Sequence, residues 1–198
     1  SKGDSTKEPN GQGSSTMKAR VTGGTRGTTT GVSEYQLNLD IALKLQTELE
    51  NRGYTVYMTR TTNDVNISNK ERAEYATSVG GEISVRIHAN GSDSSSVSGA
   101  LALMPSSSNP YVSNLSVESQ KLSEYVLDSY CASTGMNNQG AVNSDTMTGI
   151  NWCTVPVTIL EMGYMTNPND DSNMQNAGFQ TKMVTGIADG IDKYFGLQ

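Results

Sequence analysis

The sequence predicts an α/β fold, a three-layer α/β/α sandwich with a mostly parallel central sheet. Two kinds of segment alternate along the chain. Short runs are apolar or alternate between apolar and polar residues, and longer segments have apolar residues at every third or fourth position. One run, VPVTILE, is almost continuously apolar and β-branched, as is typical of a strand covered on both faces. Strands that alternate with helices in this way are characteristic of a parallel sheet with helices on both sides.

The length and charge of the chain limit the number of domains and the kinds of binding partner. At 198 residues the chain fits one domain. It has 14 Lys and Arg against 20 Asp and Glu, with no cluster of basic residues that could follow a phosphate backbone. No apolar run approaches the ~18 residues of a membrane span, and the polar start is no signal peptide. We therefore expect no nucleic-acid partner, no membrane span and a monomer.

Residues 1–32 have few apolar side chains and many glycines. They predict a long polar loop or arm, without a strand, that belongs to the same domain as residues 33–198. The glycine-rich stretch lacks the GK[ST] ending of a phosphate-binding loop. The first confident element is a helix that begins near Glu34, with Ser33 as its N-cap and Gly53 just past its end. Its buried stripe is formed by Leu37, Ile41, Leu45 and Leu49.

The next segments alternate between strand and helix. Residues 54–60, YTVYMTR, have the alternation of a strand. A short helix follows, opening with Ser68 and Glu71 at the spacing of a capping box. Residues 82–88, EISVRIH, predict the next strand, and residues 99–105, GALALMP, another.

The last third of the chain repeats the pattern. Residues 116–135 predict a helix that contains Cys131, and a polar connection that contains Cys153 leads to the buried strand VPVTILE. Two cysteines make neither a zinc-finger pattern nor a disulfide framework. The final helix places Phe179, Met183, Ile187, Ile191 and Phe195 on one line.

One element breaks the alternation. The helix near Glu34 follows a polar arm at the point where a leading strand should stand. An empty position inside a sheet would expose unpaired backbone groups and apolar helix surface. We therefore expect an N-terminally truncated domain, in which the chain starts inside the fold.

Three titratable residues are predicted to meet at one edge of the sheet. His88, the only histidine of the chain, closes one strand, Glu161 closes the buried strand, and Glu34 lies in the first turn of its helix. Ligands of open α/β sheets gather where the carboxyl ends of strands meet helix N-termini. Each residue also has an ordinary structural interpretation. An acidic side chain at the end of so apolar a strand, however, must contact water, form an ion pair or hydrogen bond, or take part in function.

From residue 33 onward the sequence resembles the zinc-dependent N-acetylmuramoyl-L-alanine amidases of bacterial cell-wall hydrolysis, in the group called amidase type 3. The matching blocks include SEYQLNLDIALKL, SVRIHANGS and VPVTILEMGYMTNPND, in the order of the family. The resemblance implies that Glu34 and His88 are zinc ligands and that Glu161 is the catalytic carboxylate. The family's first ligand, a histidine in an Asp-x-Gly-His segment after its first strand, is absent here.

The resemblance implies hydrolysis of the amide between the lactyl group of N-acetylmuramic acid and L-alanine of the stem peptide. Zinc would polarise the carbonyl and lower the pKa of bound water to about 7, and Glu161 would transfer the proton. The substrate implies an extracellular, secreted or wall-associated autolysin. Because one ligand is absent, we expect weak zinc binding, and activity of the chain by itself stays open.

Two other functions remain open from the sequence. The first is a non-catalytic cell-wall-binding or regulatory module derived from the amidase fold. The second is a glycosidase that uses Glu34 and Glu161 as a carboxylate pair about 5 to 9.5 Å apart. Arg60 and Arg72 hold a loop, contact substrate or form buried structural pairs, and the sequence does not decide between these roles.

Overall fold

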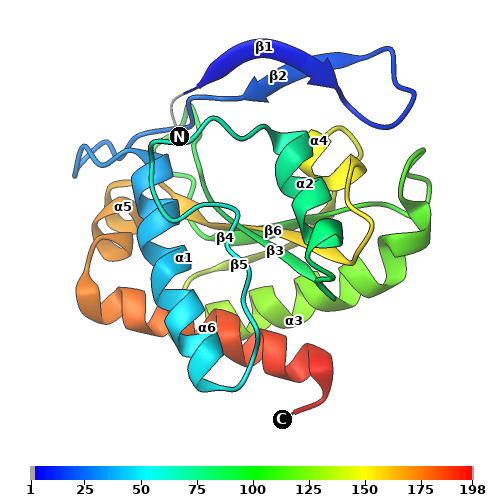
Figure 1. Cartoon of the computed structure of the whole chain (residues 1–198). Helices are drawn as coiled ribbons and strands as arrows, with labels where there is room; N and C mark the ends of the chain where they lie inside the picture. The colour runs from blue at the N-terminus through cyan, green and yellow to red at the C-terminus, as the bar shows by residue number, and fades with distance from the viewer. Residues whose placement is uncertain (1–2, 198) are drawn as a thin grey trace.

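A four-stranded sheet lies at the centre of the computed structural model, which describes residues 3–197 (Figure 1). The strand order is β3-β6-β4-β5, with β3 parallel to β6, β4 parallel to β5, and β4 antiparallel to β6. The α/β class is confirmed, and the sheet is mixed. Segment 91–99, which joins β3 to β4, is shorter than the dozen or more residues of a parallel crossover, so β4 returns antiparallel. The strands are β3 (Ser84–Asn90), β4 (Ala100–Met104), β5 (Asn138–Asn143) and β6 (Val157–Tyr164).

Helices cover both faces of this sheet. The first face is covered by α1 (Glu34–Asn51), α3 (Ser116–Thr134) and α6 (Ala177–Phe195), and the second by α2 (Asn69–Ser78) and α4 (Thr148–Asn151). Helix α5 (Pro168–Met174) follows the end of β6, and a 3-10 turn at Ser113–Leu115 precedes α3. The three-layer architecture predicted from the alternation is therefore confirmed.

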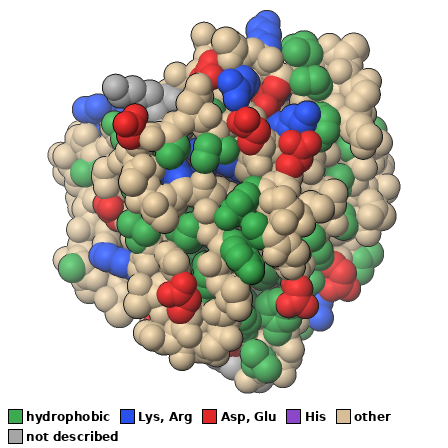
Figure 2. All heavy atoms as spheres, viewed as in Figure 1, with side chains coloured by type: hydrophobic (Ala, Val, Ile, Leu, Met, Phe, Trp, Pro, Cys, Tyr) green, Lys and Arg blue, Asp and Glu red, His purple; other side chains and the backbone are tan. Residues whose placement is uncertain are grey.

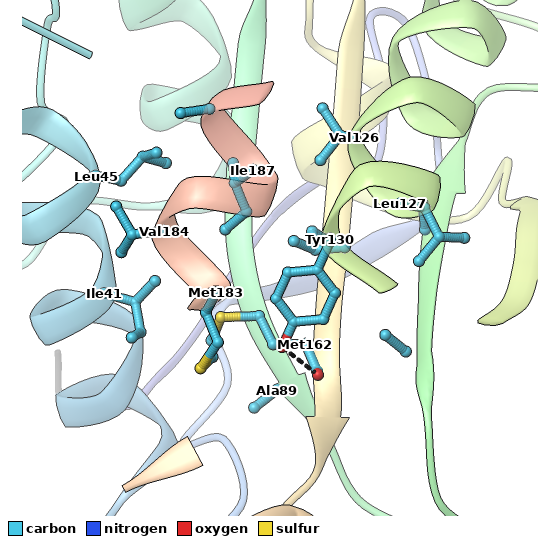
Figure 3. Close-up of a cluster of buried hydrophobic side chains, with 14 of the residues drawn as sticks. Ile41, Leu45, Ala89, Val126, Leu127, Tyr130, Met162, Met183, Val184 and Ile187 are labelled. Atoms are coloured by element: carbon cyan, nitrogen blue, oxygen red, sulfur yellow. Dashed lines mark hydrogen bonds between the residues drawn. The ribbon is translucent and has the colours of Figure 1, made fainter. Parts of the chain in front are cut away.

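The larger part of the core lies between the sheet and the first helical layer. Figure 3 shows Met183 and Ile187 of α6 between Ile41 of α1 and Tyr130 of α3. The Tyr130 hydroxyl donates a hydrogen bond of 2.7 Å to the Met162 carbonyl of β6, which satisfies a polar group inside an apolar cluster. This core fixes β6 against α3 and α6.

Strand β6 is buried on both faces, as predicted. Leu160 and Met162 belong to the core cluster on the first face, whereas Val157 and Ile159 belong to a smaller cluster on the second. Because side chains alternate along a strand, Glu161 lies on the second face with Val157 and Ile159. The position of this carboxylate follows directly from the register of the apolar residues.

The helix ends follow the sequence signals closely. Helix α1 begins at Glu34 directly after Ser33. The capping box of α2 is formed in both directions, from the Glu71 N–H to Ser68 Oγ (3.1 Å) and from the Ser68 N–H to Glu71 Oε2 (2.6 Å). The predicted capping box of α2 is therefore confirmed, whereas the Ser33 side chain makes no capping hydrogen bond to α1.

The N-terminal arm contains a hairpin that the sequence did not reveal. Strands β1 (Asp4–Pro9) and β2 (Met17–Val21) pair antiparallel, so the prediction of a strandless arm over residues 1–32 is wrong for this part; residues 1 and 2 lie outside the described residues. The Trp152 indole donates to the Pro9 carbonyl (2.8 Å), and the Lys70 N–H donates to Glu8 Oε1 (3.0 Å). These contacts with residues distant in sequence hold a hairpin too polar to show in its own pattern.

The prediction of a strand at residues 54–60 is also wrong. This segment has no regular structure and pairs with no strand in the described part of the chain. An alternating segment becomes a strand only when a neighbour accepts its backbone hydrogen bonds, and here a cavity lies on the side of β3. β3 is consequently an edge strand.

Three short elements were not predicted. β5 and α4 lie in the segment predicted to be a polar connection, α5 follows β6, and none of them is longer than 7 residues. Cys131 and Cys153 are both buried and free. Over residues 3–197, no helix is both long and apolar enough to cross a membrane.

Candidate active site

The three predicted site residues lie at one end of the sheet. Glu34 is the first residue of α1, and His88 of β3 lies directly opposite Glu161 of β6 in the strand register. All three line a cavity of about 990 Å³. Val85, Ile87 and Ala89 pack on the first face, so His88 points to the second face, where Glu161 also lies.

Glu34 and His88 are in direct contact. His88 Nδ1 is 3.0 Å from Glu34 Oε1, and the same oxygen accepts a hydrogen bond of 3.0 Å from the Asn38 amide. The Thr25 N–H donates to the other oxygen, also at 3.0 Å. Burial alone would raise the pKa of Glu34, but these hydrogen bonds and the charge of His88 lower it to about 2. Glu34 is therefore ionised at neutral pH.

Glu161 has a different environment. Its Oε2 atom is buried and has no hydrogen-bond partner among the described residues. Burial raises the pKa of Glu161, the negative charge of Glu34 adds to the rise, and His88 and Arg86 oppose it. Two carboxylates at one site thus have pKa values that are moved in opposite directions, which is the usual arrangement of groups with different chemical roles.

A buried carboxylate that the sequence analysis missed holds the loop before Glu34. Asp171 of α5 accepts hydrogen bonds from the Thr29 and Thr30 N–H groups, both at 2.8 Å, and from the Thr30 hydroxyl at 2.7 Å. Asp171 is 0% exposed. In the sequence, an acidic residue in the first turn of α5 indicates a helix N-terminus. It does not indicate which loop this residue contacts.

The cavity also holds three arginines. Arg60 donates to the Tyr35 carbonyl (2.7 Å), Arg72 to the Thr59 hydroxyl (3.1 Å) and Arg86 to the Asn69 side chain (2.9 Å). Within residues 3–197, none of these arginines forms an ion pair with an acid, so the structural pairing left open by the sequence is not found.

Arg86, which the sequence analysis did not single out, is the most isolated of the three. Its Nε and Nη1 atoms are buried and have no hydrogen-bond partner in the described structure. Burial lowers the pKa of Arg86. Burial and then the positive charges of Arg86 and Arg60 lower the pKa of Arg72 to about 10.

The side chains at the site include donor types that zinc accepts, but there are fewer of them than a catalytic zinc usually has. Glu34 and His88 supply the oxygen and nitrogen donors that zinc accepts, whereas a catalytic zinc usually has about three protein ligands. Among residues 3–197, no group of three or more His, Cys, Asp or Glu side chains is arranged to hold a metal ion. The described residues therefore supply two donors of the kinds that zinc accepts, beside a carboxylate whose pKa is raised.

Comparison with known proteins agrees with this geometry. Residues 8–193 match the family described as N-acetylmuramoyl-L-alanine amidase. The chain is 29% identical over 167 residues to the N-acetylmuramoyl-L-alanine amidase LytC of Bacillus subtilis, covering 83% of this chain and 32% of LytC. It is 27% identical over 162 residues to the probable cell wall amidase LytH of Staphylococcus aureus, covering 82% of this chain and 50% of LytH. The chain thus spans half or less of the length of these two relatives.

Solved structures show the same fold. The amidase Ami1 of Mycobacterium smegmatis superimposes with a TM-score of 0.87 at 25% identity, covering 98% of this chain and 90% of that chain. The catalytic domain of CwlV, an N-acetylmuramoyl-L-alanine amidase from Bacillus (Paenibacillus) polymyxa var. colistinus, gives 0.77 at 27% identity, covering 88% of this chain and 92% of that chain.

Proposed function

The chain belongs to the N-acetylmuramoyl-L-alanine amidase family, and from this membership we propose that it hydrolyses peptidoglycan. The bond cleaved is the amide that joins the lactyl group of N-acetylmuramic acid to L-alanine of the stem peptide. The observation that carries the proposal is the position of Glu161, directly across the strand pair from His88, with a buried Oε2 that has no hydrogen-bond partner in the described structure.

Glu161 acts as the general base and acid in this proposal. A general base works best when its pKa lies near the working pH, and burial raises the pKa of Glu161 in that direction. Its carboxylate takes a proton from the attacking water and returns it to the amine of the departing L-alanine.

Glu34 and His88 hold zinc in this proposal. When bound, the metal supplies polarisation of the scissile carbonyl and acidification of the attacking water. The low pKa of Glu34, about 2, keeps its carboxylate charged and ready to bind a cation at neutral pH. Asn38 and the Thr25 N–H orient this carboxylate from behind.

The cellular setting follows from the substrate. A peptidoglycan amidase acts outside the cytoplasm, so we propose a secreted or wall-associated autolysin that works as a monomer. The description of LytH as a probable cell wall amidase supports this setting.

A second function is favoured by the small number of zinc ligands in the described chain. With two ligands in the described chain, the fold could serve as a non-catalytic cell-wall-binding or regulatory module. A glycosidase pair with Glu161 as the acid and Glu34 as the ionised base is the remaining alternative, and it would release new reducing sugar ends.

A zinc titration on purified peptidoglycan tests the proposal. The 198-residue chain is freed of metal, and stem-peptide release is measured as zinc is added, with magnesium as the matched control. Release that rises with zinc and stops on addition of a chelator supports the amidase. Wall binding without release at saturating zinc supports the non-catalytic module instead.

A further inference from the structure

A second cavity, of about 560 Å³, lies apart from the catalytic cavity that contains Glu161. Helix α2 separates the two, because Ser78 lines the second cavity whereas Arg72 lines the catalytic one. The short helix α4 is divided in the same way, with Gly149 on the catalytic side and Asn151 on the other. The two cavities are therefore about one helix diameter apart, about 10 to 12 Å.

The N-terminal hairpin forms one wall of the second cavity and fixes its two aromatic side chains. The Trp152 indole donates to the Pro9 carbonyl at 2.8 Å, and the Lys70 ammonium lies over the indole ring, 4.1 Å from its centroid. The Tyr111 ring lies against Gly11, where a side-chain carbon would come within 2.6 Å of it. Rings that are held in place before a ligand arrives lose little conformational entropy when it binds.

The floor of the second cavity is apolar and its rim is polar. Val112, Leu115 and Cys153 line the floor and are 6%, 8% and 2% exposed. The rim carries amides, hydroxyls and one carboxylate, from Gln12, Asn114, Thr77, Ser78, Thr154 and Glu74. These are groups that both donate and accept hydrogen bonds. No lysine, arginine or histidine is among the described residues that line this cavity.

The charges around the second cavity are mixed. Figure 2 shows acidic and basic side chains interspersed at the top of this face of the molecule, where Figure 1 places the hairpin. The Glu74 carboxylate lies 3.8 Å from the Lys70 ammonium. Proteins usually bind phosphate and carboxylate groups through Arg or Lys, so a lining without these residues does not suit an anion. It suits a neutral ligand that has many hydroxyl groups and an apolar face.

We propose that the second cavity binds a neutral N-acetylated sugar unit of the glycan strand. A sugar ring has hydroxyl groups around its edge and C–H groups on its faces. The C–H groups pack on aromatic side chains, here Trp152 and Tyr111, because an aromatic face carries partial negative charge. The polar rim hydrogen-bonds the hydroxyl groups, and the acetamido methyl group packs on the apolar floor. This inference rests on the peptidoglycan substrate proposed above and adds a glycan subsite to it.

The location of the second cavity suits such a substrate. The scissile amide is attached to one sugar of the strand, and that sugar must lie beside Glu161 for the reaction. Other sugars of the same strand extend away from it, and a strand that crosses α2 reaches the second cavity. Binding of a remote sugar there would help to hold the scissile amide in position.

The fluorescence of Trp152 tests the proposal. Trp152 is the only tryptophan of the chain, so its emission reports on this cavity. The probe is a soluble β-linked tetramer of N-acetylglucosamine, which is neutral and has neither a lactyl group nor a stem peptide. Titration to millimolar concentration should change the emission along a saturating curve. The matched control is the β-linked tetramer of glucose, which lacks acetamido groups and should bind at least about tenfold more weakly.

A pair of protein variants locates the binding site. Ser78→Arg introduces a long charged side chain at an exposed position on the rim and should weaken binding at least about tenfold. Thr47→Arg is the matched control and should bind like the unmodified protein. Thr47 is also exposed on a helix, its hydroxyl also donates to a carbonyl of its own helix, and it lines neither cavity.

Three results would overturn the proposal. They are the lack of a saturating change with the N-acetylglucosamine tetramer, equal affinity for the two tetramers, and equal affinity of Ser78→Arg and Thr47→Arg for the first tetramer. If Ser78→Arg does not fold, the comparison of the two tetramers on the unmodified protein still decides. Because the probe has no stem peptide, its binding is measured independently of amidase activity. Failure to release stem peptides would count against the proposed function, and failure to bind the probe would count against the glycan subsite.

Discussion

Replacing Glu161 by glutamine removes a base while nearly keeping the size and shape of the side chain. The carboxylate has one oxygen, Oε2, that is buried and free of hydrogen-bond partners in the described structure. If this carboxylate carries the proton of the attacking water, the variant loses proton transfer and keeps substrate binding. A positioned general base contributes about 10²- to 10⁴-fold to turnover, which corresponds to about 2.7 to 5.4 kcal/mol of barrier.

The same change should not unfold the protein. Burial disfavours the charged form of Glu161, as its raised pKa shows, and a neutral amide has a smaller desolvation cost than a carboxylate. We therefore expect the melting temperature of Glu161→Gln to equal or exceed that of the unmodified protein. Zinc content should also be unchanged, because this carboxylate is proposed to move protons and not to bind metal.

The assay compares Glu161→Gln with Glu34→Gln in the zinc-loaded protein. Stem-peptide release at saturating zinc, the zinc dissociation constant and thermal unfolding are measured for each variant. Glu34→Gln replaces a charged oxygen donor with a neutral one and should lower zinc occupancy. The assigned roles are refuted if Glu161→Gln keeps most of its activity, or if it loses zinc as readily as Glu34→Gln does.

Three further predictions concern metal, loop and thiols. With Glu34 and His88 as its two ligands in the described chain, the protein should lose zinc during dialysis against a mild chelator; one tightly retained zinc per chain would show that another group completes the site. Asp171→Ala should lower the free energy of unfolding by about 3 kcal/mol or more, because three hydrogen bonds to a buried carboxylate are lost. Asp171→Asn should lower it less. Equal denaturant midpoints for these two variants and the unmodified protein would contradict the prediction. Burial raises the pKa of both Cys131 and Cys153 to about 11. A thiol reagent at pH 8 should therefore react with both cysteines only after denaturation. Rapid reaction in the native protein would contradict their buried positions.

The sequence predicted those elements whose apolar pattern is complete within the element. Helices α1, α3 and α6 and strand β6 each bury a regular stripe or an unbroken run, so their local pattern and their tertiary packing agree. The β1–β2 hairpin could not be found in this way, because its stability comes from distant groups such as Trp152 and Lys70. Segment 54–60 shows the reverse case, in which a correct strand pattern lacks a neighbouring strand.

The same distinction applies to the site. His88 and Glu161 could be found because each ends a recognisable strand, and the edge where strands end is where ligands bind. Asp171 and Arg86 could not, because their surroundings come from distant parts of the chain: loop 22–33 contacts Asp171, and Arg86 is buried with two nitrogens that have no hydrogen-bond partner in the described structure. Residue type and spacing contain no record of such long-range contacts.

The most direct test of the central claim is an analysis of the products of peptidoglycan digestion. Purified peptidoglycan is incubated with the zinc-saturated chain, and new amino-terminal alanine and new reducing sugar ends are counted. The account predicts new amino-terminal alanine, free stem peptides and no new reducing ends. New reducing ends would show cleavage of the glycan and contradict the amidase assignment, as would intact peptidoglycan.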